Sequence, residues 1–233
     1  MMPNANDGHF SCGELVDQLL QDALQAARSH LGMEVAFISQ ITSGRRIFRY
    51  VDSDAAFGPV KVGEGHPVEE SYCQRVVDGR LPELIPDAGK NAEALSIAAT
   101  RALPVGAHIS VPINVDGEVF GTFCCFSREG RDSLDVNDLD LARSYAEFVS
   151  RVLARSAREQ NRSRQRYELI RRVMDERLYH MVYQPIFHVG RQELVGHEAL
   201  TRFTAEPLRS PDKWFAEAAP VGLQADLELA VIQ

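Results

Sequence analysis

The chain has 233 residues, of which 45% are hydrophobic and 25% are charged, a balance typical of soluble globular proteins. Its formal net charge of −8 argues against a nucleic-acid-binding platform, because phosphate contacts need a basic surface. No apolar run approaches the length of a membrane span, and the first residues lack the basic start and apolar centre of a signal peptide. We therefore expect a cytoplasmic protein that binds neither nucleic acid nor membrane.

The N-terminal region is predicted to start with a disordered segment, residues 1–11, followed by an amphipathic helix. Between Leu15 and Ala27, apolar residues recur at the three- and four-residue spacing of one buried helix face. The period then changes to that of strands, because 33–41 and 45–51 are rich in β-branched and aromatic residues and flank a Thr-Ser-Gly turn. This pattern predicts a helix followed by a β-hairpin.

A second hairpin is predicted from residues 108–115 and 118–126. These stretches flank Asp116-Gly117, the kind of dipeptide that best tolerates the positive φ angles of a tight type I′ turn. Pro112 lacks an N–H, so its strand is expected to be an edge strand or to carry a bulge. Between the hairpins, 67–79 has a helical pattern and is followed by a short strand and a further helical piece. Helices mixed with antiparallel hairpins indicate an α+β fold.

The order of these elements resembles the GAF domain family of small-ligand and dimerisation sensors, over residues 12–155. The resemblance is carried by AFISQITSGRRIFRYV, SYCQRVVDGRLPELIPD and GAHISVPINVDGEVFGTFCCFS. It implies a pocket between the sheet and the helices over it, for a cyclic nucleotide, a tetrapyrrole, a haem or no ligand, so the ligand is unknown. The residues that it places near this pocket are Glu70, Tyr72, Cys73, Arg75 and His108. A plainer interpretation makes Tyr72 and Cys73 core-facing helix residues and His108 a hydrogen-bonded strand histidine.

The four cysteines show no zinc-ligand spacing. Cys124 and Cys125 are adjacent in a predicted strand, so their side chains should point to opposite faces of the sheet. Ordinary buried thiols are the favoured interpretation, because free cysteine is among the residues most often buried. A redox sensor that uses Cys73 or Cys124 is a further hypothesis, and it would need a reactive thiolate.

A long helix is predicted from Asp135 to Leu178, about 44 residues without an internal Gly or Pro. Asp135 and Asp138 are suited to cap its N-terminus and to complement its macrodipole. Apolar residues at both ends fit a 3.5-residue repeat, whereas the centre, RSAREQNRSRQR, is almost wholly polar. We interpret 156–177 as a signalling helix through which the chain forms a homodimer. The alternative is a solvated linker helix, with a hinge or a break at its centre.

The last region contains two strand-like stretches, MVYQPIFHV and ELVGHEALTRF, joined by Gly190-Arg191-Gln192. A period of two places Glu198, Leu200 and Arg202 on one face of the second stretch. A carboxylate and a guanidinium are costly to bury without partners. Either they form ion pairs with neighbouring residues, or Glu198 holds a hard divalent cation and Arg202 holds an anionic group such as phosphate.

YQPI followed by HEALTRF resembles the start of the EAL-type cyclic di-GMP phosphodiesterases. The resemblance implies that Glu198 is a metal ligand, that Leu200 and Arg202 bind the nucleotide and its phosphate, and that Gln184 lines the site. It also implies Mg²⁺ or Mn²⁺ as cofactor and a two-metal hydrolysis that linearises cyclic di-GMP. Thr201 departs from the family pattern, in which an apolar residue is common at that position.

Residues 178–233 are interpreted as the N-terminal fragment of an EAL domain, an incomplete (β/α)8 barrel, because a complete barrel takes about 250 residues. A single carboxylate cannot form a two-metal site, so we expect a truncated chain without catalytic activity. Its apolar strand faces should pair with another chain or pack poorly. The predicted function is the sensory half of a cyclic di-GMP regulator, whose GAF domain controls an EAL-type phosphodiesterase. The alternative is a non-catalytic GAF dimerisation or interaction module with a degenerate EAL segment.

Overall fold

The structure of the protein, a computed structural model, describes residues 12–54 and 60–232. The predicted disorder of residues 1–11 lies outside the described residues. The chain divides into two compact units, Met1–Ser156 and Ala157–Gln233, and each unit has a hydrophobic core of its own.

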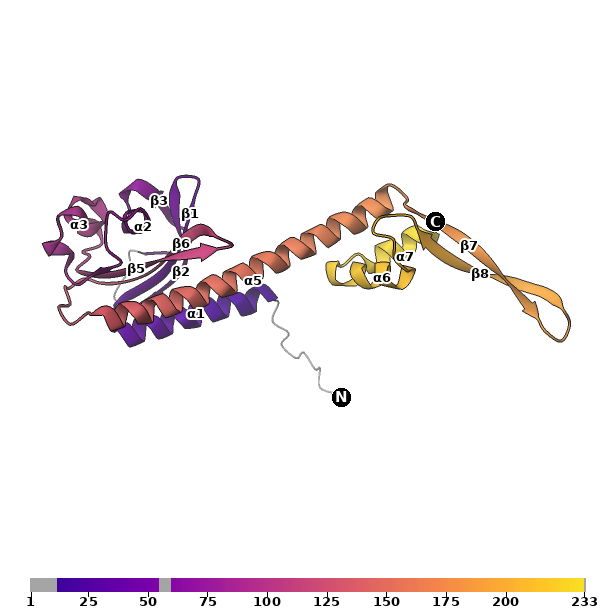
Figure 1. Ribbon diagram of the computed structural model, residues 1–233, viewed down its shortest axis with the longest axis horizontal. Helices are drawn as coiled ribbons and strands as arrows, with labels where there is room; N and C mark the ends of the chain where they lie inside the picture. Colours follow the sequence, from indigo (N-terminus) through magenta and orange to yellow (C-terminus); the bar gives the residue numbers. More distant parts are fainter. Residues whose placement is uncertain (1–11, 55–59, 233) are drawn as a thin grey trace, which may run out of the picture. The chain divides into compact units, whose positions relative to one another are not determined.

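One antiparallel sheet organises the first unit, as the sequence predicted (Figure 1). Within the described residues it has six strands in the order β3-β2-β1-β6-β5-β4, and every neighbouring pair is antiparallel. The strands are β1 (Val35–Thr42), β2 (Arg45–Ser53), β3 (Gly65–Pro67), β4 (Leu84–Ile85), β5 (Ala107–Val115) and β6 (Glu118–Ser127).

Both predicted hairpins are present, and their turns have the backbone that the sequence indicated. Asp116 and Gly117, between β5 and β6, have φ angles of 51° and 90°. Positive φ at both central residues matches the right-handed twist of the flanking strands, as in a type I′ turn. Pro112 lies on a part of β5 that has no partner on its outer side, because β4 pairs only with His108 and Ile109. The missing N–H of Pro112 therefore removes no bond from the β4–β5 pairing.

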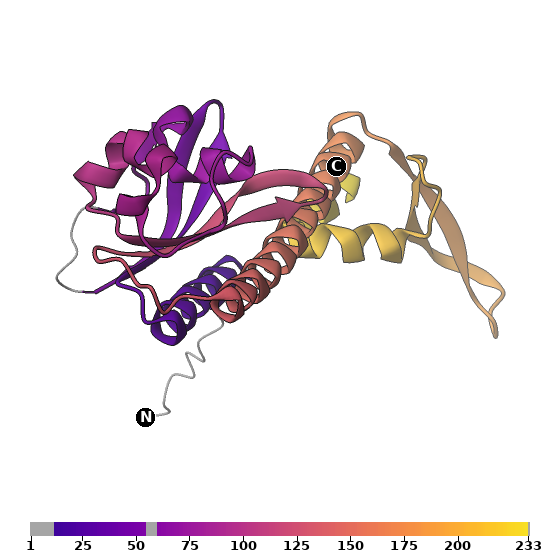
Figure 2. The same cartoon turned by 60° about the vertical axis from the view of Figure 1, so that its left-hand side comes forward.

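Helices cover both faces of this sheet, so the unit has three layers (Figure 2). On one face, α1 (Cys12–Leu31) and the beginning of α5 (Val136–Asp175) lie side by side and bury residues such as Leu24 and Ala146 against Phe123. On the other face lie the short helices α2 (Tyr72–Val77), α3 (Ala92–Ser96) and α4 (Ala98–Ala102), with the 3-10 turns η1 (Val68–Glu70) and η2 (Ala88–Lys90). Cys124 belongs to this second core and Cys125 to the first, which confirms that the two point to opposite faces.

The long helix α5 has 40 residues, close to the predicted length. Asp135 caps it as expected: the backbone N–H groups of Asn137 and Asp138 donate to Asp135 Oδ1, and the Asp135 N–H donates to Asp138 Oδ2. This reciprocal arrangement satisfies donors that the first helical turn leaves unpaired. At 1.5 Å per residue the helix is about 60 Å long, and most residues of its polar centre are exposed.

The second unit combines one hairpin with the end of α5 and two helices. Its elements are β7 (Tyr179–His188), β8 (Glu193–Phe203), α6 (Pro211–Ala218), the 3-10 turn η3 (Ala219–Val221) and α7 (Gln224–Ile232). Its core is built around Trp214, which is fully buried and packs on Phe203 with ring centroids 5.4 Å apart. Pro211 is the first residue of α6, and Ser210 at the N-cap makes no side-chain capping bond.

The predicted barrel is not visible in this unit. Its strands β7 and β8 form an antiparallel pair, whereas the repeating unit of a (β/α)8 barrel is a parallel strand followed by a helix. Poor packing was expected for this hairpin, and it is found only in the part far from the helices. Tyr179 and Phe203, at the base of the hairpin, belong to the core of the second unit. Tyr183, Phe187 and Val195, further along, are more than half exposed. Across residues 12–54 and 60–232, no helix is long and apolar enough to cross a membrane.

Candidate functional site

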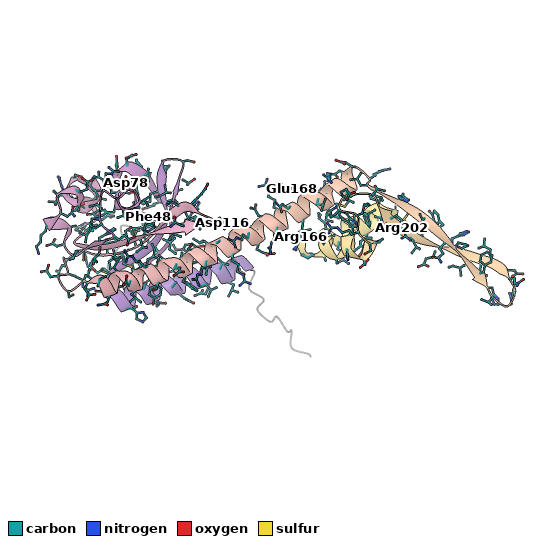
Figure 3. All side chains as sticks on the ribbon, in the orientation of Figure 1. Phe48, Asp78, Asp116, Arg166, Glu168 and Arg202 are labelled. Carbon is teal, nitrogen blue, oxygen red and sulfur yellow. The ribbon has the colours of Figure 1, made fainter. Side chains whose placement is uncertain are left out.

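A cavity of about 200 Å³ opens between β2 and α4 in the first unit. Arg46 and Phe48 from β2, His66 from β3 and Glu70 from η1 form its polar and aromatic side, and apolar residues of 98–103 form the other. It lies on the sheet face covered by α2, α3 and α4, where the sequence analysis expected a ligand pocket. Figure 3 labels Phe48 in this region.

Arg46 is the most unusual residue of the cavity, because it is a cation with 5% exposure. Its guanidinium carbon lies 4.2 Å from the ring centroid of Phe48 and 6.0 Å from that of Phe37, so two aromatic faces stabilise its charge. Its Nε is buried without a hydrogen-bond partner, and among the described residues no carboxylate pairs with it. A buried cation without a counter-charge is costly, which favours an anionic partner at this position.

His108, from β5, lies deeper on the same side of the sheet. Its ring centroid is 4.5 Å from that of Tyr72, and its Nδ1 is buried without a hydrogen-bond partner. Burial, helped by the charge of Arg46, lowers the pKa of His108 to about 3, so the imidazole is neutral near pH 7. Tyr72 is held in place by a 2.7 Å hydrogen bond between its hydroxyl and Thr100 Oγ1. The interpretation of His108 as a fully hydrogen-bonded strand histidine is therefore not what the described structure shows.

The other expected pocket residues lie in different surroundings. Glu70 is exposed and lines the cavity, and Cys73 is fully buried in α2. Arg75 does not line the cavity: its guanidinium donates to Glu93 Oε1 and to Ser96 Oγ, both at 2.6 Å. This contact ties α2 to α3, which is a structural role.

Sequence reasoning missed Arg46, although a signal for it was present. In RRIFRY the strand period places Arg46 on the same side as Phe48, and both are buried, while Arg45 and Arg49 are exposed. An arginine on the apolar side of an amphipathic strand needs a partner or a function. The run of three arginines in this stretch hides the one that faces inward.

A second candidate site is the face of the β7–β8 hairpin that carries Glu198, Leu200 and Arg202. In the strand register, Gln184 lies directly opposite Glu198, and His180 lies opposite Arg202. Directly opposite residues of an antiparallel pair share one face, so the four residues expected in the site lie together. Arg202 is labelled in Figure 3.

Glu198 and Arg202, the two charged residues of this face, are exposed. Among the described residues neither Glu198 nor Arg202 forms an ion pair, and Arg202 donates only to the carbonyl of its neighbour Thr201. The ion-pair alternative from the sequence is therefore not found. The part of the chain that the structure describes also contains no group of three or more His, Cys, Asp or Glu side chains that would hold a metal.

The first unit is thus a three-layered α+β domain, with an antiparallel sheet covered by helices on both faces and a cavity on one of them. Residues 14–154 match the family model of the GAF domain, more than half of the chain, and the chain belongs to that family. No curated protein sequence matches it.

Solved structures of similar fold include photoreceptor GAF domains. The crystal structure of the blue-light absorbing form of the Thermosynechococcus elongatus PixJ GAF domain has a TM-score of 0.53 and 14% identity, and the match covers 65% of this chain and 93% of that one. The phycocyanobilin-bound GAF domain of a cyanobacterial phytochrome has a TM-score of 0.54 and 14% identity, covering 62% and 87%. A phycoerythrobilin-bound GAF domain of a cyanobacterial phytochrome has a TM-score of 0.51 and 13% identity, covering 62% and 88%. At these identities the similarity is one of fold.

Proposed function

We propose that this chain is the sensory half of a cyclic di-GMP signalling regulator. Its GAF domain would sense a small ligand and control an EAL-type phosphodiesterase, the start of which lies in residues 178–233. Family membership supports the sensory half. The single observation that carries the enzymatic half is the shared face of Gln184, Glu198, Leu200 and Arg202 on the β7–β8 hairpin, where neither charge forms an ion pair with a described residue.

For the sensory half we propose a small anionic ligand. The buried Arg46 has no counter-charge among the described residues, and its Nε lacks an acceptor. Two of the similar solved structures hold phycocyanobilin and phycoerythrobilin. The cavity here has a volume of about 200 Å³, below the roughly 300 Å³ at which pockets for drug-sized ligands begin. A phosphate-sized or carboxylate-sized molecule suits this cavity better than a tetrapyrrole.

Replacing Arg46 by Met tests the anion site. An anion at 100 times its Kd should stabilise the parent protein by about 2.7 kcal/mol, and the variant should show no such gain. Without ligand, the variant should be more stable by about 1 kcal/mol, because Met removes a buried charge and keeps most of the volume. Thermal unfolding with inorganic phosphate and with succinate, each at constant ionic strength, measures both effects.

Arg45→Met is the matched control, because Arg45 is the preceding residue of β2 and is exposed. It loses the same charge and should keep the full response to the anion. Equal anion-induced shifts in the parent and in Arg46→Met would contradict the proposed ligand class.

For the enzymatic half, the described residues do not form a complete metal site. Glu198 brings one carboxylate, and no group of three or more suitable side chains exists among the described residues. Mg²⁺ or Mn²⁺ prefers several oxygen ligands, so this chain by itself does not fit the implied two-metal centre. The proposal therefore concerns what this face would contribute to a complete domain, with Arg202 as the phosphate contact and Gln184 beside the carboxylate.

The test is cyclic di-GMP hydrolysis with Mn²⁺ or Mg²⁺, measured on the 233-residue chain and on a version extended downstream by about 190 residues, the length that a complete barrel still requires. We expect turnover only in the extended protein. No turnover in either protein would overturn the phosphodiesterase assignment and favour a module that binds or scaffolds without catalysis.

We further propose that the chain forms a homodimer through the helical face of its first unit. An apolar groove of about 420 Å³ lies between α1 and α5 and is lined mainly by Leu19, Leu141, Tyr145 and Phe148. Leu19 and Phe148 are 39% and 43% exposed. A second copy is the occupant we propose, because Leu141, Tyr145 and Phe148 give the 40-residue helix α5 an apolar stripe at helical spacing, the kind of surface through which helices pair.

Phe148→Glu should weaken this dimer by about 100-fold in Kd, because a buried apolar contact is replaced by a charge. Arg143→Gln is the control: it changes the charge by the same amount at an exposed position of α5 that faces Glu83 instead of the groove. Sedimentation velocity over a range of concentrations measures both variants. A dimer that survives Phe148→Glu unchanged would remove this face from the proposal.

The groove also supports the alternative function, a dimerisation or interaction module without catalysis. Under that alternative, Phe148→Glu abolishes assembly, while each anion shifts the thermal unfolding of Arg46→Met and of the parent protein by the same amount. The two sets of measurements together therefore separate a sensor from a scaffold.

A further inference from the structure

Two thiols from distant parts of the sequence meet in the core under α2. Cys73 lies in α2 and Cys124 in β6, and their Sγ atoms are 3.9 Å apart. Both side chains are fully buried. Because a disulfide has an S–S length of about 2.05 Å, the two sulfurs need to approach by only about 2 Å to bond.

Hydroxyl groups surround this pair inside an otherwise apolar core. Ser39 Oγ donates to Cys73 Sγ at 3.5 Å, and Cys124 Sγ lies 3.1 Å from both Ser110 Oγ and Thr122 Oγ1. Ser39 and Thr122 are themselves joined by a 2.9 Å hydrogen bond. These groups provide polar contacts that a sulfur anion can use where water is excluded.

The surroundings give the two thiols different acidities. Burial by itself raises the pKa of Cys73, but the hydrogen bond from Cys124, the charge of Arg46 and the nearby hydroxyl groups outweigh burial and lower that pKa below its usual range. Burial and the neighbouring Cys73 raise the pKa of Cys124 well above its usual range. One sulfur is thus favoured as thiolate and the other as thiol, which are the two partners that thiol oxidation requires.

Cys125 provides an internal comparison. It is the next residue of β6 and is equally buried, but it faces the core formed with α1 and α5. Burial raises the pKa of Cys125 strongly, and none of the described residues forms a hydrogen bond with its thiol. Cys124 and Cys125 are therefore matched in burial and in position along the chain, and they differ only in the groups that surround their thiols.

We propose that Cys73 and Cys124 form a reversible disulfide when the protein meets a hydroperoxide. The Cys73 thiolate attacks one peroxide oxygen, the O–O bond breaks, and the departing hydroxide takes up a proton to become water. Cys124 sulfur then attacks the sulfenic acid on Cys73, the S–S bond forms, and the hydroxyl group leaves as water with the Cys124 proton. The two thiols lose two electrons and hydrogen peroxide gains two, so two waters are produced.

The position of the pair suggests why this bond matters to the domain. Arg46 lines the cavity, and its charge also acts on Cys73, so the cavity and the thiol pair are linked through one residue. The disulfide would join α2 to the sheet and displace the contacts of Ser110 and Ser39 with the two sulfurs. Oxidation would thus alter how α2, which carries Tyr72 and Cys73, packs on the sheet. This effect does not depend on the identity of the ligand or on the second unit.

The test is peroxide treatment of the whole chain, followed by mass spectrometry and a count of free thiols. The parent protein should lose about 2 Da and two thiols, and dithiothreitol should restore both. Trypsin places Cys73 in peptide 62–75 and both Cys124 and Cys125 in peptide 102–128. A linked pair of these two peptides should appear after oxidation, and fragmentation should locate the bond at Cys124.

Three single replacements by Ser complete the design. Cys73→Ser and Cys124→Ser should each abolish the linked peptides, whereas Cys125→Ser should form them at the parent's rate. The proposal is overturned if oxidised parent protein shows no linked peptides, if the bond maps to Cys125, or if Cys73 gains oxygen without linking. Because the peptide map of the parent protein decides the matter alone, a variant that fails to fold does not leave the question open.

Discussion

Replacing Gly121 by Ala is expected to destabilise the first unit by about 3 kcal/mol, an effect in the severe range for a single methyl group. A Cβ at this position would lie 1.9 Å from the carbonyl oxygen of Ser39 on the neighbouring strand β1. Backbone atoms of two paired strands cannot separate without breaking their hydrogen bonds. Gly121 pairs with Gln40 in the β1–β6 register, next to the Ser39–Thr122 pair, so the contact lies within the paired part of the two strands.

Hydrogen exchange of the β1 and β6 amides is a suitable measurement, because it reports the first unit separately from the second. Gly196→Ala is the control: it is also a strand glycine, and a Cβ there would meet nothing within 4 Å. Its effect on β8 should stay within about 0.5 kcal/mol. Unchanged protection of β1 and β6 in Gly121→Ala would show that the sheet can widen at this point.

Glu198→Ala is expected to lower kcat/KM for cyclic di-GMP by more than about 100-fold in the extended protein, because the proposal makes its carboxylate a metal ligand. His197→Ala is the matched control. His197 precedes Glu198 in β8 and is also exposed, but it pairs with Pro185 and so lies on the other face of the hairpin. His197→Ala should keep kcat/KM within a factor of about two of that of the extended parent protein.

Hydrolysis with varied Mn²⁺ separates a ligand role from a general loss of structure. If Glu198 holds the metal, the variant should need more Mn²⁺ for half-maximal rate, while its Tm without metal stays that of the parent. Equal rates in Glu198→Ala and His197→Ala would remove Glu198 from the site and would leave the shared face of the hairpin without a catalytic meaning.

Local features of the fold could be predicted because their causes are local. Asp116-Gly117 can form a tight turn wherever it lies, and Asp135 finds its capping partners within three residues. Strand and helix periods likewise depend on a few neighbouring residues. For this reason both hairpins, α1 and the 40-residue α5 appear close to where the sequence placed them.

The candidate pocket was predicted only in outline. Tyr72, Cys73 and His108 do lie on one side of the sheet. Arg75 was expected beside them, but Glu93 and Ser96 bind it, and these partners lie about twenty residues further along the chain. Arg46, the residue with the strongest reason to meet a ligand, was hidden among neighbouring arginines that face the solvent.

By itself, then, the sequence determined the α+β class, the GAF family resemblance, the long helix and the motif around Glu198, since each depends on short-range patterns. The tertiary structure alone decided that Arg46 is buried without a counter-charge, that Gly121 lies against Ser39, and that Cys73 and Cys124 approach to 3.9 Å. These facts depend on strand register and on the packing of α2 over the sheet, which join residues 34 to 82 positions apart. Contacts at such separations are set by the whole core, so no local pattern of residues encodes them.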